Sequence, residues 1–192
     1  MWDSALSEHG WVHWQWAAVI AASLVAAVTD WRAGRIPNAL TGPFLLGGLA
    51  WAFSVAGRAG VMDAVGGMFL MALPFVILFV FAGGGAGDAK LMGALGAWLG
   101  LGQGALALLA VLVAGGVYGV AVAAWRGELL NTFKRVGQSV KIMFFAFVLR
   151  SMPRIDTEGR RPAPPDQVNM PYAVPVCIGV CVAAARVWMT SP

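Results

Sequence analysis

The 192-residue sequence is 59% apolar and only 11% charged, with a formal net charge of +4. Soluble domains carry about 25% charged residues, so this chain has too few polar side chains to cover a globular surface, and the composition excludes an ordinary soluble domain. The basic excess follows membrane topology, as shown below, and we expect no nucleic-acid partner.

Stretches without Lys, Arg, Asp or Glu follow one another along the chain, at residues 10–29, 36–57, 64–87, 91–125 and 167–185. A helix that crosses a bilayer needs about 20 mostly apolar residues, and each stretch is near or above that length. A cleavable signal peptide begins with a basic region, whereas Asp3 and Glu8 precede the first stretch. We therefore expect the first stretch to be a retained membrane span.

The fourth stretch is too long for a single span. As one helix, residues 91–125 would measure about 52 Å, against a hydrocarbon core of roughly 30 Å. Gly100, Gly102, Gln103 and Gly104 interrupt it, and such a cluster favours a turn. We predict a short helix near residues 89–100 and a full one near 104–125, which gives six spans in total.

The positions of the basic residues provide a test of the predicted six spans. With six spans both termini lie on one side of the membrane, and the loops of the other side hold all but Arg58 and Arg186 of the 13 Lys and Arg residues. Because cytoplasmic loops are enriched in Lys and Arg, we expect both termini outside the cytoplasm. The predicted location is the cell inner membrane.

The connector at residues 126–167 is the longest predicted segment outside the spans. Its first half carries apolar residues at helical spacing, typical of a helix lying on the inner leaflet, and its second half is rich in Pro and charge. A solvated basic connector and a substrate-facing element both remain open. The predicted fold is all-α: one membrane-embedded domain over residues 1–192, with six transmembrane helices and an interfacial cytoplasmic helix.

Between Glu8 and Glu128 the sequence contains three acidic residues, Asp30, Asp63 and Asp88. The predicted topology places Asp30 and Asp88 at the cytoplasmic membrane edge and Asp63 at the opposite edge. Acids near hydrocarbon are costly and are functional candidates by default. Two carboxylates at close range do not both ionise easily, so one holds a proton while the other acts as a base. Since such a pair titrates as a unit, the pattern predicts aspartyl proteolysis without assigning either role.

Boundary ion pairs are the alternative, in which Asp30 pairs with Arg32 or Arg35 and Asp88 pairs with Lys90. Other chemistries fit less well. His9 and His13 lie near the N-terminus, away from both aspartates, so neither a Ser-His-Asp triad nor a zinc site is indicated, and we expect no metal and no cofactor. Cys177 and Cys181 are expected to be packing residues of the last span.

The glycines before Asp88 are candidate substrate contacts. Residues 83–87 read Gly-Gly-Gly-Ala-Gly, which lacks the Gly-Lys-Ser/Thr ending of a phosphate-binding loop. Glycine lets a backbone bend sharply and lets a substrate strand approach closely. We therefore take Gly85, Gly87 and Lys90 as candidate substrate-binding residues.

Three motifs resemble those of the type IV prepilin peptidases, membrane aspartyl proteases of the Gly-x-Gly-Asp type. The first is the segment from Asp30 through Ile36-Pro37-Asn38, the second is Gly85-Ala86-Gly87-Asp88-Ala89-Lys90-Leu91, and the third is Pro171-Tyr172 at the start of the last span. The resemblance covers roughly residues 15–190. It implies that Asp30 and Asp88 are the catalytic pair.

The resemblance also implies a substrate. Such enzymes remove the short basic leader of pilin or pseudopilin precursors at the cytoplasmic membrane face, usually after a glycine and before a hydrophobic helix. The bilayer and such a precursor are thus the expected partners. Longer members carry an N-terminal domain with cysteine motifs and also N-methylate; this sequence resembles the short Flp/Tad-type form, so methylation is not expected.

Presenilin-like proteases fit less well, because Thr29 replaces their Tyr before Asp30. A six-span transporter or pilus-assembly scaffold is the non-enzymatic alternative.

Overall fold

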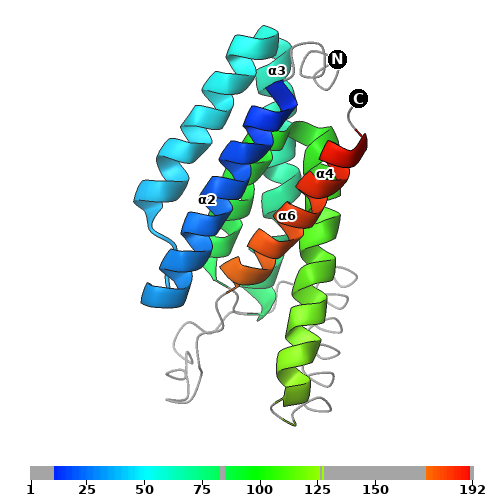
Figure 1. Cartoon of the computed structure of the whole chain (residues 1–192). Coiled ribbons are helices and arrows are strands. Elements are labelled where there is room, and N and C mark those ends of the chain that lie inside the picture. Colours follow the sequence, from blue (N-terminus) through cyan, green and yellow to red (C-terminus); the bar gives the residue numbers. More distant parts are fainter. Residues whose placement is uncertain (1–10, 83–84, 126, 128–171, 191–192) are drawn as a thin grey trace, which may run out of the picture. The chain divides into compact units, whose positions relative to one another are not determined.

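The computed structural model describes residues 11–82, 85–125, 127 and 172–190, and these residues form helices and short turns only (Figure 1). The helices are α2 (Trp11–Ala33), α3 (Asn38–Ala82), α4 (Ala86–Trp125) and α6 (Ala173–Thr190). The predicted interfacial helix and nearly all of the 126–167 connector lie outside the described residues. By its internal contacts the chain divides into residues 1–119 with 171–192, and residues 120–170. The site lies in the first unit.

Both long helices are broken by a glycine. The 45-residue α3 loses helical geometry at Ala56 and Gly57, and the 40-residue α4 loses it at Gly100. Gly57 and Gly100 have φ angles of 58° and 68°, a left-handed conformation that glycine adopts without steric cost. Each helix therefore consists of two legs, residues 38–55 and 58–82 of α3 and residues 86–99 and 101–125 of α4, which run in opposite directions (Figure 1). The predicted break in the fourth apolar stretch is confirmed.

The helices have the length and composition of membrane spans. In the described residues, α2, α3 and α4 are long and apolar enough to cross a bilayer, and α6 is a shorter apolar helix. Large apolar side chains point outward on α3 and α4, including Phe53, Phe69, Leu109 and Val113, each at least 60% exposed. A protein in water would bury such side chains, whereas lipid tails accommodate them. The all-α class is confirmed, and the helices indicate an integral membrane protein.

The first leg of α4 is the centre of the fold. Residues 91–100 are buried except for the half-buried Trp98. The indole N–H of Trp98 donates to the Phe44 carbonyl at 2.8 Å, and its ring stacks on Phe44 at 5.0 Å between centroids. From α2, the side-chain amide of Gln15 donates to the Trp98 carbonyl. Two elements, α2 and α3, are thereby tied to α4, the helix that carries Asp88.

Glycines allow the second leg of α3 to lie directly on this central leg. A Cβ on Gly67 would lie 2.5 Å from the Gly96 carbonyl oxygen, and a Cβ on Gly96 would lie 2.3 Å from the Gly67 carbonyl oxygen. Backbones approach this closely only where both residues lack a side chain, a common device of membrane helices. The contact holds the second leg of α3 against the leg that carries Asp88.

Candidate active site

Asp30 lies three residues before Ala33, the last residue of α2. The Gly34 N–H donates to the Asp30 carbonyl at 2.8 Å, and Gly34 has a φ angle of 61°, so a left-handed glycine ends the helix in the usual way. The Asp30 side chain is half-buried. Its Oδ2 accepts a hydrogen bond from the backbone N–H of Ala173 at 3.2 Å.

Ala173 is the first residue of α6, so Asp30 caps the start of that helix. The first N–H groups of a helix have no partner within it and carry partial positive charge, which makes them good donors to a carboxylate. The bond joins residues 143 positions apart. The Pro171-Tyr172 motif predicted the start of this helix, where Pro is common, but no motif predicted its contact with Asp30. Tyr172 is exposed, and Pro171 lies outside the described residues.

Asp88 lies in the first turn of α4. Its backbone N–H donates to the Gly85 carbonyl at 3.2 Å, and its side chain is half-buried. The Asp88 carboxylate lies close enough to that of Asp30 for the two negative charges to repel each other. The structure therefore brings together the two residues that the sequence predicts as a pair, from helices 58 positions apart in the chain.

Gly85 and Gly87 have roles in the protein itself. A Cβ on Gly85 would lie 2.6 Å from Asp88 Oδ2, so the bare glycine leaves the space that this carboxylate occupies. A Cβ on Gly87 would lie 3.4 Å from the Ile36 Cβ, which places the start of α4 against the turn that follows α2. The two glycines thus position Asp88 and bring the two aspartate-bearing segments together. Contact with substrate stays a prediction for both.

Among the described residues, neither Asp30 nor Asp88 forms a salt bridge, so the boundary ion pairs considered above are not formed there. Arg32 and Arg35 are exposed. The Lys90 ammonium instead donates to the side-chain carbonyl of Asn38 at 3.1 Å. This bond links two motif positions, one at the start of α3 and one near the start of α4.

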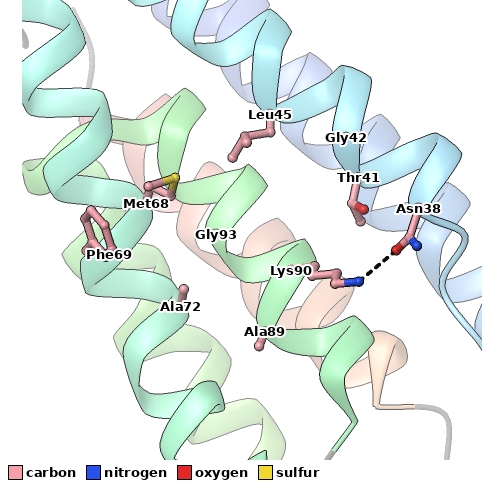
Figure 2. A pocket seen from close by; sticks show the side chains of 10 residues that line it. All are labelled: Asn38, Thr41, Gly42, Leu45, Met68, Phe69, Ala72, Ala89, Lys90 and Gly93. Atoms are coloured by element: carbon pink, nitrogen blue, oxygen red, sulfur yellow. Dashed lines mark hydrogen bonds between the residues drawn. The ribbon is translucent and has the colours of Figure 1, made fainter.

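An open cavity of about 380 Å³ lies next to this bond, between both legs of α3 and the first leg of α4 (Figure 2). It begins at Ala89 and Lys90, directly after Asp88. Its walls are apolar or small except for Asn38, Thr41 and Lys90. A second cavity of about 220 Å³ lies between the second legs of α3 and α4 and the start of α6, where Tyr172 lines it.

Other reactive groups lie away from the aspartates. The described residues contain no cluster of three or more His, Cys, Asp or Glu side chains that could hold a metal ion. His13 lies near the opposite end of α2, against Trp188 at 6.2 Å between ring centroids. Cys177 and Cys181 are not disulfide-bonded.

The described helices are apolar and carry two half-buried carboxylates near each other at one end, which defines a helical membrane protein with a paired-aspartate site. A sequence model described as the type IV leader peptidase family matches residues 17–120, a region that contains Asp30 and Asp88. The chain belongs to this family, as its motifs predict.

Two curated relatives match part of the chain. Each is named "Prepilin leader peptidase/N-methyltransferase", one from Burkholderia pseudomallei strain 1026b and one from strain K96243. Each is 39% identical over 115 residues, which make up 57% of this chain and 37% of the relative. The match thus spans little more than a third of the length of these relatives. No solved structure matches the chain.

Proposed function

We propose that the chain is a membrane aspartyl endopeptidase that removes the short leader peptide of type IV pilin-like precursors at the cytoplasmic membrane face. One observation carries the proposal: the half-buried side chains of Asp30 and Asp88 come from different helices and lie near each other at one end of the fold, without a salt-bridge partner among the described residues. Such an arrangement costs stability, which is expected where the residues serve chemistry. Membership of the leader peptidase family supports the same reaction.

The chemistry needs one proton shared between the two carboxyl groups. The ionised group takes a proton from a water molecule, and the water oxygen attacks the carbonyl carbon of the scissile peptide bond. The protonated group gives its proton to the carbonyl oxygen. When the tetrahedral intermediate collapses, the C–N bond breaks and the leaving amine takes a proton from one carboxyl group. One hydroxyl of the intermediate returns its proton to the other carboxylate as the new carbonyl forms, which restores the singly protonated pair. The Ala173 N–H holds one Asp30 oxygen in place throughout.

The proposal includes six membrane crossings with both termini outside the cytoplasm. Two observations support this number. The breaks in α3 and α4 divide these two helices into four legs, and the Lys and Arg residues are concentrated on one predicted side of the membrane. The first leg of α4 is short, about 21 Å over residues 86–99. A short leg is tolerable here because this leg is buried inside the protein, so its ends need not reach both lipid interfaces. Cysteine labelling from either side of the membrane tests the orientation, with the label at Arg58 reached from outside and the label at Arg35 reached from the cytoplasm.

The test of the reaction is co-expression with a short-leader pilin precursor from the same genome, followed by gel shift and mass spectrometry of the product. Asp30→Asn and Asp88→Asn should each lower processing by about 10²- to 10⁴-fold, the usual contribution of a positioned acid or base. Asp63→Asn is the control. Asp63 Oδ2 accepts from the Leu101 N–H at 3.2 Å, and the Asn carbonyl can accept the same bond. Normal processing by all three variants would refute the proposal and favour a non-enzymatic scaffold or transporter.

A further inference from the structure

The open cavity of about 380 Å³ begins directly after Asp88, at Ala89 and Lys90. We name it the α3–α4 groove and define it by Asn38, Gly42, Leu45, Phe69, Ala72 and Gly93 among its lining residues. Along α4 it extends from Ala89 to Gly93, about 6 Å at 1.5 Å per residue. A peptide bond held at the aspartates would therefore be followed directly by this groove.

The floor of the groove is made of small residues. Gly42, Ala72, Ala89 and Gly93 line it, while Leu45, Met68 and Phe69 provide larger apolar walls (Figure 2). Small residues on a membrane helix allow a second helix to approach closely. The side chain of Phe69 is 63% exposed, so the groove is open outward on the apolar surface of the protein rather than enclosed.

Polarity changes along the groove. The Lys90 ammonium and the Asn38 amide lie at the end next to Asp88, where they are exposed and bonded to each other. Beyond Thr41 the lining is apolar. A lipid tail has no polar group that could bond to the polar end of the groove. A peptide that passes from a polar cut site into an apolar helix matches both ends.

We propose that the α3–α4 groove holds the apolar helix of the precursor that follows the scissile bond, and that it contacts the first two turns of that helix. The inference rests on the proposed function, because the groove has this occupant only if the aspartates cut the peptide. It adds a recognition surface to the reaction: the groove sets the position of the scissile bond by holding the segment after it.

A large side chain at Gly42, which lines the groove, is expected to block it. A Cβ built on Gly42 meets no heavy atom within 4 Å, so the side chain of Gly42→Phe starts from open space in a wall of the groove. Gly119 is the matched control, since it is also a helical glycine with open space around its Cβ and lines neither cavity. Gly116→Phe tests the second cavity in the same way.

We expect Gly42→Phe to lower precursor processing by about tenfold or more, the discrimination that apolar pockets achieve, while Gly119→Phe and Gly116→Phe remain within a few-fold of the wild type. A loss with Gly116→Phe and not with Gly42→Phe would overturn the assignment, because it would move the substrate to the second cavity. Equal losses with all three would also overturn it.

Photo-crosslinking tests occupancy directly. Phe69 and Phe53 are 63% and 60% exposed on the same helix, but Phe53 does not line the groove. Each is replaced by p-benzoylphenylalanine in an Asp88→Asn background, which retains uncut precursor. The precursor should crosslink to position 69, within the first two turns after the cut site, and not to position 53. Equal crosslinking at both positions, or crosslinks to lipid only, would overturn the groove. If the wild-type chain cuts no precursor, the proposed function fails; if it cuts normally and the groove variants behave like their controls, only the groove fails.

Discussion

The two ends of the described structure each place one carboxylate on the start of a helical segment, with the same geometry. Asp63 accepts from the Leu101 N–H at 3.2 Å, directly after the break in α4, and Asp30 accepts from the Ala173 N–H at 3.2 Å. Helix capping fully accounts for Asp63. At the other end a second carboxylate, Asp88, lies close enough to repel Asp30. Capping needs one acid, so the second acid at this end requires another explanation, which the proposed catalysis would provide.

The largest effect is expected from Gly85, which has no counterpart at the Asp63 end. In Gly85→Ala the new Cβ would lie 2.6 Å from Asp88 Oδ2, so the carboxylate must rotate away. Because only the end of a side chain moves, the fold should be retained. A catalytic group displaced by about 1 Å can cost on the order of a hundredfold in rate, and we expect a loss of processing of that size at unchanged thermal stability.

Gly119→Ala is the control for this variant. A Cβ on Gly119 would meet no heavy atom within 4 Å, and processing should remain within a few-fold of the wild type. If Gly85→Ala processes normally, the position of the Asp88 carboxylate seen here is not the one that catalysis uses, and the contrast between the two ends weakens.

Much of this comparison could be predicted from the sequence, and the rest could not for a physical reason. The cluster that begins at Gly100 predicted the break in α4, because glycine acts on its own backbone. Asp30 and Asp88 could be predicted as a pair because acids in apolar surroundings are rare and charge asymmetry orients the spans. The bond from Ala173 to Asp30 depends on which helices are neighbours, and no local pattern encodes that. The clash that a Cβ on Gly85 would make with Asp88 could not be predicted either, because it depends on where the side chains lie.

A smaller effect should separate the two caps. Asp63→Ala removes the acceptor for Leu101 and should lower the free energy of unfolding by about 1 kcal/mol, the usual value of a helix cap. Asp30→Ala removes the equivalent acceptor but also relieves repulsion with Asp88, so its destabilisation should be smaller. Thermal unfolding in detergent measures both. Processing should survive Asp63→Ala and be lost with Asp30→Ala. A larger destabilisation at Asp30 than at Asp63 would contradict the idea that the pair costs stability.

The smallest effect concerns the bond between Lys90 and Asn38. It joins the two motif segments at the Asp88 end, but both side chains are exposed, and exposed polar contacts contribute little because water competes for them. A double-mutant cycle with Lys90→Met and Asn38→Ala should give a coupling energy below about 1 kcal/mol in unfolding.

The effect of these variants on processing is a separate matter, because the same two residues form the polar end of the α3–α4 groove. Each single variant should raise the KM for precursor more than it lowers kcat, because neither side chain touches the reacting bond. A fall in kcat at constant KM would instead place Lys90 among the groups that act on the aspartates, and the end with two carboxylates would then need a cation as well.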